Sequence, residues 1–145
     1  MRIVIDSNVL FSALIRNSTV RRMIFEYDGL FLFPSFIFEE LELHKSELVE
    51  KSGMGKQDFE RLLQAILGKV EVVGKDRLLP QREEAEGLVK EIDRDDAVFI
   101  ACVLAYPGSA LWSDDKRLKK IKGVSVLSTG DILDWLPGMD QNQKL

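Results

Sequence analysis

The stretch IVIDSNVLFSAL, residues 3–14, predicts how the fold begins. A short β-branched run leads to Asp6, as is typical of a buried strand. The residues after it place apolar side chains at helical spacing, namely Val9, Leu10, Ala13 and Leu14. A strand that leads directly into a helix indicates the first half of a βα unit.

The rest of the chain continues this alternation. We expect four more strands, over residues 30–33, 70–73, 109–113 and 124–128. We expect helices over residues 7–15, 19–27, 36–51, 56–69, 81–92, 93–106, 114–121 and 129–136, with Ser35 as a helix cap and residues 74–80 as a loop. The fold class is therefore α/β: a three-layer α/β/α sandwich with a central parallel five-stranded sheet. Residues 1–137 are expected to form one domain, and residues 138–145 a flexible tail.

Composition narrows the class of protein. The 145 residues are 46% hydrophobic and 30% charged, which is typical of a globular domain. No apolar run is long enough to span a membrane, and the N-terminus does not resemble a signal peptide. Cys102 is the only cysteine, so we expect no internal disulfide and a reducing, cytoplasmic setting. The net charge of −4 argues against nucleic-acid binding through a general basic field.

Acidic residues gather where strands end and helices begin. They are Asp6 after the first strand, Asp114 and Asp115 after the fourth, Asp93, Asp95 and Asp96 before the buried helix, and Glu39 or Glu40 after the second strand. Any one of them could serve as a helix cap or as a solvated surface residue. Carboxylates that converge at one sheet edge would repel one another, and a divalent cation would relieve that repulsion. Oxygen ligands of this kind suit Mg²⁺ or Mn²⁺.

Four motifs carry a family resemblance. They are IVIDSNVLFSAL, PSFIFEEL, DRDDAVFIACVLA and LWSDDKRL, in this order along the chain. Together they resemble the PIN domain family of small metal-dependent ribonucleases, from about Arg2 to Leu136.

The resemblance implies a set of metal-binding and catalytic residues. These are Asp6, Glu40, Asp96 and Asp115, with Asp93 and Asp114 as second choices and with Ser7, Asn8 and Ser113 as supporting polar residues. Three acids stand within four residues at the third motif, so Asp93 remains the rival of Asp96. At the fourth motif, Asp115 is expected to face the metal, while Asp114 caps the short helix that follows or binds through water.

The sequence contains no other convincing nucleophile. His44 is the only histidine and lies in a charged helical stretch, where a solvated role is expected. A water activated by Mg²⁺ or Mn²⁺ is then the available attacker, with one or two ions. The resemblance implies hydrolysis of phosphodiester bonds in single-stranded or looped RNA. Candidate phosphate contacts are Arg16, Arg21, Arg22, Lys116, Arg117, Lys119 and Lys120, although ordinary surface charge explains them equally well.

Other functions fit these residues less well. A phosphoaspartyl receiver or a haloacid-dehalogenase-type phosphatase would require a second acid close to Asp6, where the chain has Ser7 and Asn8. A non-catalytic PIN-like module that binds protein or RNA is the stronger alternative. The resemblance also implies a toxin with an antitoxin partner, or a stand-alone RNA-processing enzyme. The amphipathic hairpin over residues 36–67 offers a surface for a homodimer or an inhibitor, although core packing also explains most of its apolar residues.

Overall fold

Five short parallel strands form the centre of the protein. The computed structural model describes residues 1–15 and 18–135. The strands are β1 (Ile3–Ile5), β2 (Phe31–Pro34), β3 (Val70–Val73), β4 (Ala110–Trp112) and β5 (Val126–Leu127). They pair in the order β3-β2-β1-β4-β5, and every pair is parallel. The predicted five-stranded parallel sheet is confirmed.

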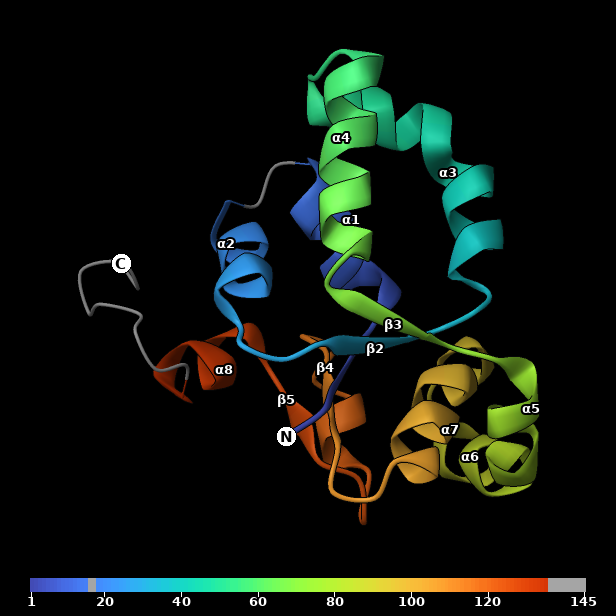
Figure 1. The fold of residues 1–145 in the computed structure, drawn as a ribbon. Coiled ribbons are helices and arrows are strands. Elements are labelled where there is room, and N and C mark those ends of the chain that lie inside the picture. The colour runs from blue at the N-terminus through green and yellow to red at the C-terminus, as the bar shows by residue number, and fades with distance from the viewer. Residues whose placement is uncertain (16–17, 136–145) are drawn as a thin grey trace.

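Helices cover both faces of this sheet. They are α1 (Ser7–Ile15), α2 (Ser18–Glu26), α3 (Ile37–Ser52), α4 (Lys56–Leu67), α5 (Lys75–Leu78), α6 (Arg82–Val89), α7 (Ala97–Ala105) and α8 (Thr129–Trp135). Figure 1 shows α1, α3 and α4 on one side of the sheet and α5, α6 and α7 on the other. The three-layer α/β/α prediction is therefore confirmed. The tail predicted over residues 138–145 lies outside the described residues.

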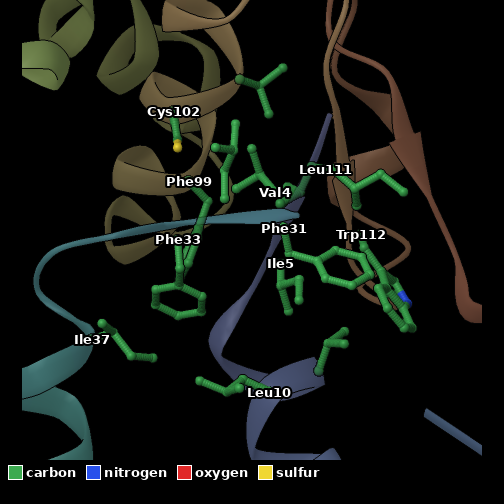
Figure 2. Close-up of a cluster of buried hydrophobic side chains, with 14 of the residues drawn as sticks. Val4, Ile5, Leu10, Phe31, Phe33, Ile37, Phe99, Cys102, Leu111 and Trp112 are labelled. Atoms are coloured by element: carbon green, nitrogen blue, oxygen red, sulfur yellow. The ribbon is translucent and has the colours of Figure 1, made fainter. Parts of the chain in front are cut away.

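Aromatic side chains fill the core between the layers. Phe33 of β2 meets Phe99 of α7 edge-on, with ring centroids 5.5 Å apart, and Trp112 of β4 lies 5.9 Å from Phe31 (Figure 2). Because α7 is apolar on nearly every side, it is buried against the sheet, as its sequence predicted. Burial raises the pKa of the Cys102 thiol on this helix to about 12, which leaves it without thiolate character at neutral pH.

Three local predictions were wrong. Ser35 does not cap α3; the residue before the helix is Phe36, and the Ser35 backbone N–H instead donates to the Val73 carbonyl of β3. Residues 75–81, expected within a loop and at the start of a helix, form α5 and a short 3₁₀ turn. The helix expected over residues 114–121 is only a 3₁₀ turn, Leu118–Lys120.

The topology brings distant segments to one edge. β1 and β4 are adjacent, with Ile5 opposite Trp112, so the residues after both strands leave the sheet at its carboxyl edge. Since α7 leads back to the start of β4, the beginning of α7 is expected at this edge too. Within the described part of the chain, every helix falls short of the length and apolar character that a membrane span requires.

Candidate functional site

Asp6 is held rigidly at the end of β1. Its backbone N–H donates to the Trp112 carbonyl, which extends the pairing of β1 with β4 by one residue. Its side-chain Oδ1 accepts from the Val9 N–H at 2.8 Å and so caps α1. The residue is 6% exposed, and this burial raises the pKa of the Asp6 carboxyl despite the hydrogen bonds that lower it.

Ser113 joins Asp6 to the loop after β4. This serine is 1% exposed, and its backbone N–H donates to the Leu127 carbonyl of β5. Its hydroxyl donates to the Asp6 carboxylate and accepts from the Asp115 N–H at 3.2 Å. One buried hydroxyl therefore fixes the backbone of Asp115 relative to the side chain of Asp6.

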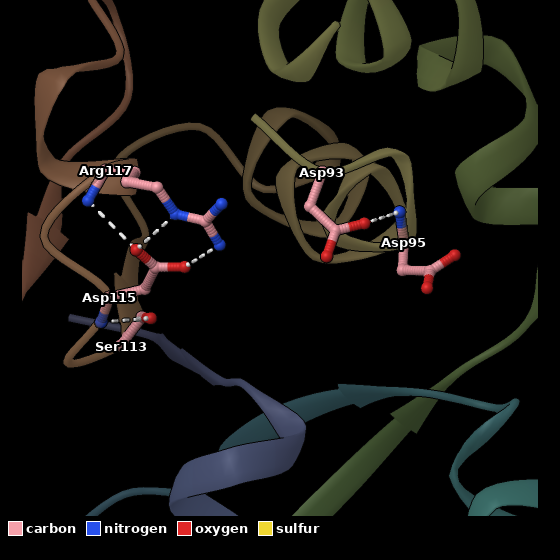
Figure 3. Close-up of polar contacts among 5 residues, drawn as sticks. All are labelled: Asp93, Asp95, Ser113, Asp115 and Arg117. Atoms are coloured by element: carbon pink, nitrogen blue, oxygen red, sulfur yellow. Dashed lines mark hydrogen bonds and ion pairs between the residues drawn. The ribbon is translucent and has the colours of Figure 1, made fainter. Parts of the chain in front are cut away.

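Arg117 holds the carboxylate of Asp115. The guanidinium donates from Nη2 to Oδ2 at 2.8 Å and from Nε to Oδ1 at 3.1 Å (Figure 3). The Arg117 backbone N–H donates to the same Oδ1 at 2.9 Å. These contacts lower the pKa of the Asp115 carboxyl, so that it carries its charge over the whole neutral range.

Asp114 has a different role from its neighbour. Its Oδ1 accepts from the Thr129 backbone N–H and its Oδ2 from the Thr129 hydroxyl, both at 2.7 Å. The expectation that Asp114 caps the short helix directly after it was wrong. It accepts instead from the first residue of α8, a helix that Ser128 caps, and the turn after β4 is capped by Asp115.

Asp96 and Asp93 also differ in their local roles. Asp93 accepts from the Asp95 N–H at 3.0 Å and so caps the 3₁₀ turn Arg94–Asp96 that precedes α7 (Figure 3). Asp96 stands immediately before α7 and makes no side-chain cap bond. Its carboxylate is therefore left available, whereas that of Asp93 already has a structural task.

Mutual repulsion connects the three aspartates. The pKa of Asp96 is raised to about 6, first by burial and then by the negative charges of Asp93, Asp115 and Asp6. The charges of Asp114 and Asp115 likewise raise the pKa of Asp6. Asp6, Asp96 and Asp115, hereafter the aspartate cluster, thus influence one another from three separate segments of the chain.

The aspartate cluster fits a divalent cation in its chemistry. Carboxylate oxygens are the donors that Mg²⁺ and Mn²⁺ prefer, and a cation would reverse the repulsion that raises the pKa of Asp96. Even so, within residues 1–15 and 18–135 no three His, Cys, Asp or Glu side chains converge as a ready-made metal-binding group. The donor set is present, but the side chains are not drawn together around a common point.

Glu40 lies beside this edge, on α3. Its carboxylate is 3.4 Å from Nε2 of His44, one helical turn along. Glu40 and His44 line a pocket of about 500 Å³ together with Ser7 and Asn8 from the first turn of α1. The structure thus brings Glu40 near the predicted supporting residues Ser7 and Asn8. His44 is not simply solvated, because its ring also contacts Phe11 edge-on at 5.7 Å.

The predicted phosphate contacts have varied surroundings. Arg21 donates from Nε to the Ala13 carbonyl at 2.8 Å and so ties α2 to α1. Arg22 pairs with Glu26, and Lys119 with Asp131. Lys116 and Lys120 are exposed, and they follow Asp115 closely in the sequence. The prediction for Arg16 lies outside the described residues.

Thr129 was not among the predicted site residues. Its hydroxyl donates to Asp114 and accepts from Nε1 of Trp112 at 3.0 Å, so it joins β4, the loop after it and α8. Thr129 follows Ser128, whose hydroxyl accepts from the Asp131 N–H at 3.1 Å and so caps α8, a recognisable sequence signal for the start of a helix. Its partners 15 and 17 residues away cannot be identified from that signal.

Comparison with known structures agrees with this fold. The chain resembles, in fold, a chain in the crystal structure of VapBC2 from Rickettsia felis bound to a DNA fragment from their promoter. The TM-score is 0.66 and the sequence identity 14%, over 88% of this chain and 98% of that one. No curated protein matches the sequence at a significant level.

A family model provides the assignment. The model described as the PIN domain matches residues 4–136, a span that begins within β1 and contains the acidic residues of all four motifs and the strands β2 to β5. The chain therefore belongs to the PIN domain family.

Proposed function

We propose that this protein is a Mg²⁺- or Mn²⁺-dependent endoribonuclease that hydrolyses phosphodiester bonds in single-stranded or looped RNA. The observation that carries the proposal is the aspartate cluster, in which the charges of Asp6 and Asp115 help to raise the pKa of Asp96 to about 6. Such repulsion is unfavourable in a site that serves only stability, and it is expected where carboxylates await a cation.

The roles of the residues follow from their surroundings. Asp6, Asp96 and Asp115 would hold the cation, and Glu40 would act from the side of α3. When bound, a divalent cation supplies an activated water at neutral pH and stabilises negative charge on a phosphodiester. Ser113 keeps Asp6 and Asp115 in register through its buried hydroxyl. Ser7 and Asn8 line the adjoining pocket, from which they would orient the phosphate or a water.

Cleavage of a mixed RNA pool in Mn²⁺, with wild-type protein and Asp6→Asn side by side, tests the proposal. The asparagine retains an oxygen that can accept from the Val9 N–H, so the cap of α1 is preserved while the charge is lost. We expect wild type to cleave RNA and Asp6→Asn to be slower by about 100-fold or more. Equal cleavage by both proteins would assign the activity to a contaminant.

A non-catalytic interaction module is the second candidate. It is favoured by the absence, in the described part of the chain, of three acidic or histidine side chains already converged for a metal. Such a module would bind RNA or protein equally well in EDTA and in Mn²⁺, and it would cleave nothing.

Partners are proposed on two grounds. The structural neighbour comes from the VapBC2 complex, so we propose a small antitoxin protein as inhibitor of this chain. In addition, Phe38 and Leu43 of α3 are 54% and 77% exposed, which supports a homodimer or inhibitor contact on the α3–α4 hairpin.

Light scattering of wild type and of Leu43→Glu tests the homodimer. The toxin role is tested by comparing the growth of cells that produce this protein alone with the growth of cells that also produce the protein encoded by the adjacent gene. We propose that the protein acts in the cytoplasm.

A further inference from the structure

The ion pair between Arg117 and Asp115 has a consequence for cation binding. Both carboxylate oxygens of Asp115 accept hydrogen bonds from the Arg117 guanidinium, and Oδ1 also accepts from the Arg117 backbone N–H. A carboxylate in this state has little capacity left for a metal ligand bond. The guanidinium faces the same acids that a cation would face, since the charges of Asp96 and Asp93 also act on Arg117.

The pair is placed so that it can be exchanged. The side chain of Arg117 is 58% exposed and that of Asp115 27% exposed, so the guanidinium can move into water without leaving a buried charge behind. Exposed ion pairs contribute little to stability, although a two-pronged arginine contact is stronger than most. Meanwhile Ser113 fixes the backbone of Asp115, so only the side chains have to move.

We propose that Arg117 is an internal counter-ion that a divalent cation must displace from Asp115, and that this displacement draws the aspartate cluster together. The inference rests on the proposed function, because it assumes that Asp6, Asp96 and Asp115 bind the cation. It explains why the described acids do not form a ready-made metal site. The displaced guanidinium remains beside the cluster, next to the place where an RNA phosphate would approach.

Mn²⁺ titrations followed by electron paramagnetic resonance, in the absence of RNA, test the competition directly. We expect Arg117→Gln to bind Mn²⁺ about 3- to 10-fold more tightly than wild type, because no guanidinium has to be displaced. Arg117→Lys keeps the charge without the two-pronged contact, so we expect its affinity for Mn²⁺ to lie between those of wild type and Arg117→Gln. Lys116→Gln removes one positive charge from the neighbouring exposed residue and is the matched control.

A second readout follows the arginine itself. In the metal-free protein the Nε–H of Arg117 is hydrogen-bonded to Asp115, so its NMR signal is expected to be shifted and slow to exchange with water. Saturating Mg²⁺ should move this signal to the position of a free arginine. A signal that does not respond to bound Mg²⁺ would overturn the inference.

The outcomes separate this inference from the function on which it rests. If Asp96→Asn loses Mn²⁺ binding while Arg117→Gln binds like wild type, only the counter-ion role of Arg117 is wrong. The same holds if Lys116→Gln gains as much affinity as Arg117→Gln, because the gain then reflects general charge. If Asp96→Asn binds Mn²⁺ as wild type does, the proposed metal site itself is wrong. Circular dichroism of each variant verifies that it is folded.

Discussion

Asp114 accepts two hydrogen bonds from Thr129, one from the backbone N–H and one from the hydroxyl, each 2.7 Å long. The adjacent Asp115 instead pairs with Arg117 and faces the other acids of the aspartate cluster. Two neighbouring carboxylates thus point to different partners, and their substitution should have different effects.

Replacing Asp114 with alanine should lower stability and leave cleavage largely intact. The change removes the acceptor of two Thr129 donors at the start of α8, and we expect the free energy of unfolding to fall by about 1 kcal/mol in urea. Asp115→Asn should show the reverse, with a folded protein and a large loss of cleavage. If Asp114→Ala abolishes cleavage while remaining folded, the assignment of the two residues is inverted.

Thr129→Val should destabilise the protein more than Thr129→Ser. Valine has a similar shape but no hydroxyl, so Asp114 loses one donor and the Nε1–H of Trp112 loses its acceptor. We expect a loss of about 2 kcal/mol in the free energy of unfolding for valine and well under half of that for serine. Far-UV circular dichroism during urea unfolding provides the measurement, and equal losses in both variants would argue against these hydrogen bonds.

The stability of the metal-free protein should fall as pH rises from about 4 to about 6. The pKa of Asp96 is raised from 3.8 to about 6, so in this window the folded protein retains a proton that the unfolded chain has released. A group that binds its proton more tightly when folded contributes stability at low pH, and this contribution is lost as pH rises through the folded value.

Asp96→Asn should remove most of this pH dependence. At pH 7 the variant should be more stable than wild type in EDTA by about 1 kcal/mol, a figure reduced to allow for solvent screening of a half-buried group. Adding Mn²⁺ should raise the melting temperature of wild type and not of the variant. Parallel urea titrations across this pH range provide the test, and identical slopes for both proteins would contradict it.

Glu40→Gln should impair cleavage less than Asp6→Asn does. Glu40 is partly exposed and lies against His44, whereas Asp6 is 6% exposed and electrostatically coupled to Asp96. We expect a loss of about 10-fold in kcat/KM for Glu40→Gln, consistent with a supporting ligand. Single-turnover cleavage at saturating Mn²⁺ checks this, and a loss equal to that of Asp6→Asn would give Glu40 an equal share in the site.

The general form of the site was predictable because parallel strands end at a common edge. β-branched runs identified β1 and β3, and the rule that ligands bind beyond the carboxyl ends of strands placed Asp6 and Asp115 on the same side. The stretch after Asp96 predicted the buried helix α7 because nearly all of its residues are apolar. Residue type and the length of each apolar run were sufficient for these elements.

Contacts between side chains were less predictable. The hydrogen bonds of Asp114 to Thr129 span 15 residues, and no local pattern indicates them. The helix α5 was not predicted because Gly74 and Pro80 suggest a loop. In the structure, Gly74 is extended and lies just before the helix. Pro80 lies in the first turn of a 3₁₀ segment, where its missing N–H costs nothing. Arg117 was predicted as a phosphate contact, while its pairing with Asp115 depends on the tight turn after β4.

Because a single peptide bond separates Asp114 from Asp115, the last helix of the domain is mechanically connected to the acidic edge. A partner that pulls on α8 would transmit that force through Thr129 and Asp114 to the residue beside Arg117. A partner bound to α8 could therefore change the position of Asp115 without contacting the aspartate cluster itself.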